Sequence, residues 1–366
     1  MAGTESLSAW LRLTLTPGIG GETQRKLLTA FGLPDAVFTA SYSSLRAVIG
    51  DKAVRLLLDT NNETAIAHAE AWAQGEGQHI VTLADPDYPQ TLLEIPDPPT
   101  VLYVRGRVEL LNHPILSIVG SRNPTPQGIQ NAERFAGALA EAGLVIASGL
   151  ALGIDAAAHR GALAANGGTV AFIGTGIDRI YPARNCDLAR EIGTRGAIVS
   201  EFPIGTPVIA ANFPRRNRLI SGISRGVLVV EAAIESGSLI TARLAGEQGR
   251  DVFAIPGSIH SPQSKGCHQL IKQGAKLVES AQDIVEEMNW NFPSTDHKEG
   301  TTTEAESPSA NQELLPLMGF DPCSLDELVA RSGLTADVLS VMLLHLELEG
   351  HIASLPGNRY QRLQNR

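Results

Sequence analysis

The sequence predicts an α/β fold whose centre is a doubly wound, mostly parallel sheet, and three observations carry this prediction. Between residues 114 and 289, short β-branched apolar runs alternate with stretches of helical periodicity. Several of these runs are followed at once by glycines and other small residues. The chain has 366 residues, which at roughly 150 residues per domain leaves room for smaller domains on either side.

Seven apolar runs are the expected strands of this sheet. They are Ile115–Val119, Val145–Ala147, Thr169–Ile173, Ala197–Ser200, Val227–Glu231, Asp251–Ile255 and Lys276–Val278. Amphipathic helices are expected between several of them, as at Gln127–Ala142 and Ser238–Glu247. Continuously apolar strands separated by helices are typical of a parallel sheet covered on both faces.

The region before the sheet is expected to be helical. From residue 7 to residue 80, apolar residues recur at three- and four-residue spacing, as in Leu27, Leu28 and Phe31. Residues 1–83 are therefore predicted to form a small helical domain, similar to SAM or helix-hairpin-helix domains. The prolines of residues 84–113 indicate an extended connector with one edge strand at Thr100–Val104, so the central domain is taken as residues 84–290.

The turn Thr16–Gly21 inside the helical region has two interpretations. Its glycines allow positive φ and a close backbone approach, as in a helix-hairpin-helix turn whose amides touch a DNA phosphate. The alternative is a simple turn between helices, since only Arg25 and Lys26 lie nearby to help hold a phosphate.

After the central domain, the composition changes twice. Residues 291–310 are polar, rich in Ser and Thr and without periodicity, which predicts a flexible linker. In residues 311–366, helices are expected near 312–319, 325–331 and 335–349, and then a hairpin that turns at Pro356–Asn358. Three helices followed by a hairpin are the arrangement of a winged-helix domain.

Composition limits the classes of function. With 43% hydrophobic and 19% charged residues the chain can form folded cores. Its 29 Lys and Arg against 39 Asp and Glu give a net charge of −10, which excludes histone-like wrapping of nucleic acid but allows a local basic groove. Three scattered cysteines (Cys186, Cys267 and Cys323) argue against a disulfide framework or a zinc site. Without a signal sequence or an apolar run near 18 residues, we expect a soluble, cytoplasmic protein that does not act at a membrane.

Small residues and hydroxyls follow the predicted strands. In an open α/β sheet, ligands bind at the carboxyl ends of the strands, and these turns offer free amides and helix starts that suit an anion. The candidate residues are Gly120, Ser121 and Arg122; Ser148 and Gly149; Gly174, Thr175 and Gly176; and Ser236, Gly237 and Ser238. No Walker A loop occurs, and Arg179 stands where a dinucleotide fingerprint needs its third glycine, so no NAD or ATP cofactor is expected.

The segment Asn212–Gly222 is unusually basic. Arg215, Arg216, Arg218 and the later Arg225 lie within it or just beyond it without a carboxylate, and Phe213 precedes them. Arginines that neutralise a backbone and an aromatic ring that stacks on a base are the combination used by single-strand binders. The candidates here are Asn212, Phe213, Arg215, Asn217 and Arg218, with Arg122 and Arg184 extending the groove. The alternative is a solvated basic turn whose Phe213 only packs.

Candidate catalytic groups are few. Asp155 and His159 stand at i and i+4 at a helix start and can share a hydrogen bond, although Asp155 there also suits a helix cap. Glu231 and Glu235 flank the end of the fifth strand, where a hydrolase can use one as a base. Cys267 and His268 are adjacent in sequence, which does not bring thiol and imidazole face to face, and no metal-ligating constellation is visible.

These motifs together resemble a known family. The strings IVGSR (118–122), SGLALGIDAAAH (148–159), FIGTGIDRIYPARN (172–185), SEFPIGT (200–206), NFPRRNRLISGIS (212–224) and VVEAAIESGSLITARLA (229–245) occur in order, followed by GRDVFAIPGS (249–258) and GCHQLIKQGAKLV (266–278). They are similar to those of the DNA processing protein A family (DprA, also called Smf), across the whole α/β domain.

The resemblance implies a bacterial cytosolic protein without catalysis that binds incoming single-stranded DNA during natural transformation. Such a protein shields the strand, helps displace single-strand-binding protein and loads a RecA-type recombinase. The α/β domain would be an extended Rossmann-like fold that forms a homodimer. The family's strand-binding pocket maps onto Gly120, Ser121, Arg122, Ser148, Gly149 and the segment Asn212–Arg218. Relatives often have a basic residue where this chain has Leu152, and no motif marks the recombinase contacts.

Two other functions stay open from the sequence. The domain more distantly resembles Rossmann-like nucleotide-binding enzymes that hydrolyse nucleoside monophosphates, in which case Glu235 or Asp155 would act and the glycine turns would hold one phosphate. A winged helix can also read duplex DNA. Its expected helix at 335–349 has no Lys or Arg but carries Asp337, Glu347 and Glu349, which favours a role in protein contacts or in supporting the dimer.

Overall fold

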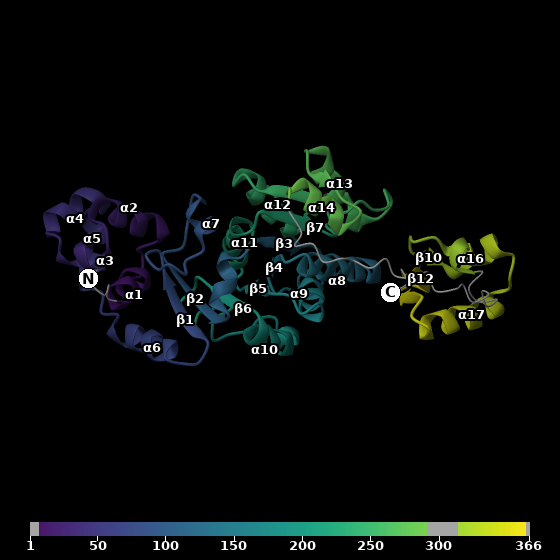
Figure 1. Ribbon diagram of the computed structural model, residues 1–366, viewed down its shortest axis with the longest axis horizontal. Coiled ribbons are helices and arrows are strands. Elements are labelled where there is room, and N and C mark those ends of the chain that lie inside the picture. The colour runs from purple at the N-terminus through teal and green to yellow at the C-terminus, as the bar shows by residue number, and fades with distance from the viewer. Residues whose placement is uncertain (1–6, 291–313, 364–366) are drawn as a thin grey trace.

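Three groups of secondary structure follow one another along the chain, as Figure 1 shows, and the computed structural model describes residues 7–290 and 314–363. The first group is helical: α1 (Leu7–Leu15), α2 (Gly21–Phe31), α3 (Pro34–Thr39), α4 (Tyr42–Ile49), α5 (Asp51–Asp59) and α6 (Glu63–Ala73). Their apolar positions enclose a core that includes Leu13, Leu27 and Leu57. Another set of apolar residues in this helical group, which includes Trp10 and Leu11, packs on the neighbouring sheet.

The second group is built on a nine-stranded sheet. Its strands are β1 (Gln78–Thr82), β2 (Val101–Gly106), β3 (Ile115–Val119), β4 (Val145–Ser148), β5 (Thr169–Phe172), β6 (Ala197–Ser200), β7 (Gly226–Val229), β8 (Asp251–Ala254) and β9 (Lys276–Leu277). The spatial order is β1-β2-β6-β5-β4-β3-β7-β8-β9. Neighbours from β6 to β9 pair in parallel, while β2 pairs antiparallel with both β1 and β6. The predicted doubly wound, mostly parallel sheet is confirmed.

Helices cover both faces of this sheet. Helices α8 (Pro126–Glu141), α9 (Ile154–Ala164), α10 (Cys186–Arg195) and α14 (Ala281–Glu287) lie on one face, and α7 (Gln90–Leu93), α11 (Asn212–Ile223), α12 (Gly237–Glu247) and α13 (Lys265–Lys272) lie on the other. Three short 3₁₀ turns, η1 (Val108–Asn112), η2 (Ala183–Asn185) and η3 (Pro262–Ser264), complete the connections. Because both faces are covered, the strands are apolar on both sides.

Two predictions about the start of the sheet are wrong. Gln78–Thr82 is a strand, although helical periodicity was extended to residue 80. Val101–Gly106 is not an edge strand, because it lies between β1 and β6 and its first four residues are buried. The prolines that suggested an edge end at Pro99, before the strand begins, and therefore leave its backbone amides free to pair.

The third group contains α15 (Leu314–Met318), β10 (Cys323–Ser324), α16 (Leu325–Ser332), α17 (Ala336–Leu348), β11 (Ile352–Leu355) and β12 (Arg359–Arg362). The strands form one small sheet in the order β10-β12-β11. Three helices followed by a hairpin confirm the predicted winged-helix arrangement. The predicted linker at 291–310 lies outside the described residues.

No single helix in residues 7–290 and 314–363 is long and apolar enough to cross a membrane. Helices α16 and α17 taken together, with a bend of 109° between them, meet such a criterion by length and composition alone.

Candidate nucleic-acid interface

The strand order creates a crevice beside β3. From β3 the chain proceeds through β4, β5 and β6 on one side and then returns to β7 on the other side. Val119 pairs with Val229, so the loops after β3 and β7 leave the sheet at the same level and diverge. Such a switch in strand order is where open α/β sheets bind ligands. A cavity of about 460 Å³ lies there, and we call it the crevice.

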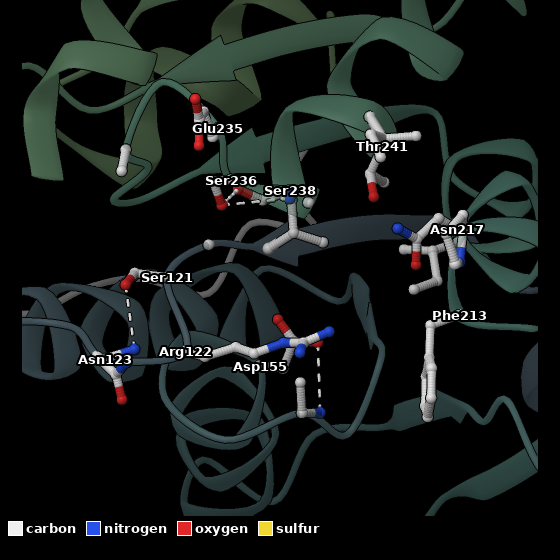
Figure 2. Close-up of a pocket in the computed structure, with 18 of the residues that line it drawn as sticks. Ser121, Arg122, Asn123, Asp155, Phe213, Asn217, Glu235, Ser236, Ser238 and Thr241 are labelled. Atoms are coloured by element: carbon white, nitrogen blue, oxygen red, sulfur yellow. Dashed lines mark hydrogen bonds between the residues drawn. The ribbon is translucent and has the colours of Figure 1, made fainter. Parts of the chain in front are cut away.

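Eight of the predicted site residues line the crevice. They are Gly120, Ser121, Arg122, Phe213, Asn217, Ser236, Gly237 and Ser238. Figure 2 shows the exposed Arg122 side chain reaching toward Asp155, with Ser236 and Ser238 on the side of α12 and Phe213 on the far side from Ser121. A cation, a helix start and an aromatic ring thus surround one space.

Close packing of the loops shapes the crevice floor. A Cβ at Gly120 would lie 2.7 Å from Ile154 Cγ1 and 2.9 Å from the Glu231 carbonyl oxygen. Gly153 has φ +81°, and a Cβ there would lie 2.3 Å from the Ser121 carbonyl oxygen. Only glycine fits at these two positions, which brings the loop after β3 against the start of α9.

The N-terminus of α12 forms one wall. The Ser236 hydroxyl accepts a hydrogen bond from the Ser238 amide at 3.3 Å and so caps the helix. The first amides of an eleven-residue helix carry a partial positive charge that favours an anion. The predicted turn at residues 236–238 therefore lies at a helix start, as its sequence indicated.

The crevice floor contains two buried side chains of opposite charge, Arg216 and Asp155, which both bond backbone groups of the surrounding loops. Arg216 donates to the carbonyl oxygens of Gly149 (2.6 Å) and Phe172. Asp155 accepts from the amides of Gly149 (3.1 Å) and Ala151 (3.4 Å). Burial raises the pKa of the Asp155 carboxyl, against the opposing charge of Arg216, and lowers the pKa of Arg216 to about 10. The pair ties the ends of β4 and β5 to α11.

The basic segment is a helix, which contradicts the alternative interpretation as a solvated turn. It forms α11, and its arginines point in different directions. The side chain of Arg215 is 52% exposed and that of Arg218 11% exposed, and both contact the carboxylate of Glu201, at 3.1 and 2.5 Å. Arg218 Nε also lies 3.2 Å from Asp97. The segment itself contains no carboxylate, but in the fold Glu201 and Asp97 from other parts of the chain pair with its arginines.

Phe213 is positioned at the start of α11 by its neighbours. A Cβ at Gly174 would lie 2.9 Å from Phe213 Cδ1, so the ring packs directly on that glycine. The Asn212 side chain donates to the Gly174 carbonyl oxygen at 3.1 Å. The Tyr181 ring lies 5.7 Å from the Phe213 ring, centroid to centroid, at 46°. Tyr181 is exposed, and the sequence analysis did not single it out.

The remaining predicted residues do not line the crevice. Those outside it are Ser148, Gly149, Gly174, Thr175, Gly176, Arg184, Asn212, Arg215 and Arg218. Ser148 and Thr175 are buried, and their hydroxyls donate to the carbonyl oxygens of Ile118 and Arg179. The Gly149 amide is taken by Asp155 and the Gly176 amide by the Thr206 carbonyl oxygen. Of the four anion-holding turns expected to converge, only those after β3 and β7 contribute predicted residues to the crevice, and the Ser121 amide after β3 is itself bonded to the Glu231 carbonyl oxygen.

Most of the candidate acid–base groups form hydrogen bonds that hold the fold together. Asp155 does not cap α9, whose N-cap is Gly153, and bonds the loop 149–151 instead. His159 bonds Thr169 Oγ1 at 2.7 Å, and burial lowers its pKa to about 3. Glu231 accepts from the amide and hydroxyl of Thr125, while Glu235 is exposed at the rim of the crevice.

The described residues do not bring together a cysteine and a histidine as a reactive pair, nor a set of side chains that could hold a metal ion. Cys267 is buried, and burial raises the pKa of its thiol to about 12. The adjacent His268 bonds the Gly257 carbonyl oxygen at 2.9 Å. The Cys267 thiol instead lies 3.7 Å from the carbonyl oxygens of Val229 and Val230. Among residues 7–290 and 314–363, no three His, Cys, Asp or Glu side chains gather to hold a metal ion.

The turn between α1 and α2 is surrounded by paired charges. Arg25 forms an ion pair with Asp97, and Lys26 lies 2.8 Å from Glu22. A small cavity of about 140 Å³ beside Gly20 and Gly21 is also lined by Asp97 and Glu201. These carboxylates favour the interpretation as a simple interhelical turn over a phosphate-binding one.

Comparison with known proteins identifies the family. Residues 79–289 match the family model of DNA recombination-mediator protein A, and residues 298–358 match the DprA winged helix domain. The chain is 38% identical over 365 residues to Protein Smf of Escherichia coli (strain K12), which covers 97% of this chain and 95% of that protein. It is 48% identical over 209 residues to DNA processing protein DprA of Streptococcus pneumoniae (strain ATCC BAA-255 / R6), covering 57% and 74%.

Two solved structures are similar in fold. The structure of DNA processing protein A from Streptococcus pneumoniae covers 80% of this chain and all of its own, with a TM-score of 0.69 and 38% identity. That of DNA processing protein A from Helicobacter pylori, described for its single-stranded DNA binding mode, covers 58% and 97%, with a TM-score of 0.53 and 32% identity. The sequence motifs, the sheet with its crevice and the C-terminal winged helix together place this chain in the DNA recombination-mediator protein A (DprA/Smf) family.

Proposed function

We propose that this protein binds single-stranded DNA across the crevice and the start of α11. The observation that carries the proposal is the meeting of an exposed arginine, a helix N-terminus and an aromatic ring around one space, represented by Arg122, Ser238 and Phe213. The Helicobacter pylori relative, described for its binding of single-stranded DNA, supports the choice of ligand.

The physical roles follow from the surroundings of each group. A phosphate lies between the Arg122 guanidinium and the N-terminal end of α12, where the full charge of the arginine and the partial positive charge of the helix coincide. A base stacks on Phe213, because every base has a face that an aromatic ring can accept without reading sequence. Binding is therefore expected to depend strongly on salt and little on sequence.

Arg215 and Arg218 contribute differently from Arg122. Arg215 is half-exposed and reaches the strand at the outer side of α11, although Glu201 offsets part of its charge. Arg218 holds α11 against Glu201 and Asp97 and thereby orients Phe213. Arg184, exposed in η2, extends the binding surface beyond Phe213.

We further infer the cellular role from the family. As a recombination mediator, the protein acts as a cytoplasmic homodimer in natural transformation, protects incoming single strands, helps displace single-strand-binding protein and loads a RecA-type recombinase. The winged helix serves protein contacts: α17 exposes Val338, Val341, Leu344 and Leu348 and carries no Lys or Arg. Catalysis is not part of the proposal.

Titration of labelled oligothymidine across a salt series tests the site. Arg122→Ala is expected to weaken binding and to lower the slope of log K against log salt by roughly 0.7, the value for one phosphate contact on a single strand. Phe213→Ala is expected to cost about ten- to hundredfold at most and to leave the slope unchanged. Arg190→Ala removes another exposed arginine, which lies on α10 and pairs with Asp187, and is the control.

The combined variants decide the outcome. Arg122→Ala with Arg215→Ala is expected to lose little more than Arg122→Ala alone, because Glu201 already pairs with Arg215. If Arg122→Ala with Phe213→Ala bound oligothymidine as tightly as the unchanged protein, the strand would lie elsewhere and the site would be wrong.

A further inference from the structure

We propose that Tyr181 is a second base-stacking residue, which takes the base next to the one on Phe213 and continues the strand's path from the crevice toward Arg184. The proposal rests on the proposed function and assigns one more contact of the same ligand. It is carried by the position of the segment Tyr181–Asn185, in which Arg184 already belongs to the proposed binding surface and Tyr181 has no role so far.

The segment is anchored to the crevice. The Asn185 side chain is buried and donates to the carbonyl oxygens of Leu150 (2.9 Å) and Ala151 (3.1 Å). Ala151 itself lines the crevice. The residues before Asn185 are thereby held beside the loop that follows β4, at a fixed place relative to the crevice.

The rings of Tyr181 and Phe213 form one continuous surface. Their centroids are 5.7 Å apart at an angle of 46°, which is a direct ring-to-ring contact. A base held between two rings needs them about 7 Å apart, twice a carbon–carbon contact of roughly 3.5 Å. The pair therefore cannot clamp one base, and successive bases are accommodated on its outer faces instead.

The direction of the path follows from the neighbours of Phe213. Phe213 lines the crevice, packs on Gly174 and touches Tyr181. Tyr181 is 48% exposed as a residue, and its side chain is therefore accessible to a base. A strand whose phosphate occupies the crevice thus passes from Phe213 to Tyr181.

A cation stands at the end of this path. Arg184 is exposed three residues after Tyr181, and no carboxylate of the described residues forms an ion pair with it. An exposed, unopposed guanidinium beside a stacking platform is suited to the phosphate that follows the second base. The arrangement repeats that of Arg122 and Phe213 one nucleotide further on.

The test compares a strand with bases and a strand without them. Affinities are measured by fluorescence anisotropy of the full chain with labelled oligothymidine of about twenty nucleotides and with an abasic oligonucleotide of equal length and charge. Tyr181→Ala is expected to weaken oligothymidine binding about fivefold or more, with less than about a twofold change on the abasic strand. Tyr181→Phe keeps the ring and is expected to bind both strands as the unchanged protein does.

Two further variants separate stacking from folding. Tyr181→Leu keeps apolar contact with Phe213 but has no ring face, and is expected to show the same base-dependent loss as Tyr181→Ala. Tyr42→Ala removes an exposed tyrosine of α4 and is expected to change neither affinity. Arg184→Ala is expected to weaken binding to both strands and to reduce the salt slope by roughly 0.7.

The outcomes distinguish this proposal from the proposed function. Equal losses on both strands for Tyr181→Ala and Tyr181→Leu, or no loss on oligothymidine, would overturn the role of Tyr181. If Arg122→Ala and Phe213→Ala still weakened binding in that case, the crevice would stand and only the second stacking position would fail. If all of these variants bound as the unchanged protein, the crevice assignment would fail with it.

Discussion

Gly174 determines where the Phe213 ring lies. A Cβ at Gly174 would lie 2.9 Å from Phe213 Cδ1 and 3.1 Å from its Cε1, so Gly174→Ala must displace the ring. We expect weaker oligothymidine binding, up to the loss caused by Phe213→Ala, with an unchanged salt slope because no charge is removed. Anisotropy titrations at several salt concentrations measure both quantities.

A second glycine variant serves as the control for that prediction. Gly246 lies in α12, where an added Cβ meets no atom within 4 Å. Gly246→Ala is expected to leave binding unchanged and to stabilise the helix by about 0.5–1 kcal/mol. Wild-type affinity for Gly174→Ala would mean that the position of the ring does not matter for the strand.

At the residue scale, the sequence predicted which types of side chain form the site better than it predicted where each side chain points. The four arginines and Phe213 were recognisable as a binding set, but Arg215, Arg216 and Arg218 occupy three different environments on α11. Arg216 shares a buried face with Leu219, Ile220 and Ile223, at helical spacing. That periodicity was available in the sequence and indicates which arginine faces inward. The partners Glu201 and Asp97 are distant in sequence and become neighbours only in the fold.

At the element scale, His159 joins α9 to two strands. Thr169 Oγ1 donates its only hydrogen to the Ile146 carbonyl oxygen at 2.7 Å, so it accepts from His159, whose Nδ1 carries the proton. Burial, with the nearby charges of Arg216 and Arg160, lowers the pKa of His159 to about 3. The folded protein therefore holds this imidazole neutral at pH 7.

This neutral histidine predicts a dependence of stability on acid. Between pH 6.5 and 3, His159 takes up a proton in the unfolded chain but not in the folded one. The free energy of unfolding therefore decreases as the pH is lowered through this range, by up to about 1.4 kcal/mol per pH unit. The buried Asp155, Glu201 and Glu231, whose pKa values burial raises, act in the opposite direction. Urea unfolding of the protein and of His159→Gln, compared from pH 7.5 to pH 4.5, isolates the contribution of His159.

The variant is expected to lose acid sensitivity relative to the unchanged protein. His68→Gln, which changes an exposed histidine of α6, is expected to keep it. A constant difference between His159→Gln and the unchanged protein across this range would show that His159 takes up its proton equally in the folded and the unfolded chain.

Helices and strands could be predicted from the sequence where a single local pattern, such as a continuous apolar run, was clear. The central strands are continuous apolar runs, and β3, β6 and their neighbours begin and end within a residue or two of the prediction. Strand β1 was missed because Gln78–Thr82 is short and follows a helix whose periodicity was carried too far. Helix α11 was not predicted, because charge and Pro214 obscured its periodicity, although proline is well tolerated in the first turn of a helix. In both cases, long-range pairing or packing decides the structure.

At the scale of the whole molecule, the N-terminal helices complete the core of the sheet domain. Trp10, Leu11 and Ile66 are buried with Val101 and Tyr103 of β2 in one apolar cluster. Gln24 accepts from the Thr100 hydroxyl at 2.6 Å, and Arg25 pairs with Asp97. Strand β1 pairs with β2 over five residues. A cut between residues 83 and 84, at the predicted domain boundary, removes all of these partners.

Truncation from the two ends is therefore expected to give opposite results. A chain of residues 1–290 keeps the crevice, the N-terminal helices and Trp290, whose indole donates to the Ala142 carbonyl oxygen at 3.0 Å. We expect it to bind oligothymidine with the affinity per binding site and the salt slope of the full chain. Residues 84–290 expose the apolar face of β2 and an unpaired strand edge, so we expect aggregation or a markedly lower melting temperature.

Thermal unfolding and anisotropy titration of the two truncated chains measure this contrast. Residues 76–290 form the informative intermediate, because they restore β1 but not the cover of Trp10 and Leu11. Their melting temperature is expected to lie between those of the other two chains. Equal stability of residues 84–290 and 1–290 would show that the helical region folds and acts independently of the sheet, and a large loss of strand binding in residues 1–290 would move part of the DNA site into the winged helix.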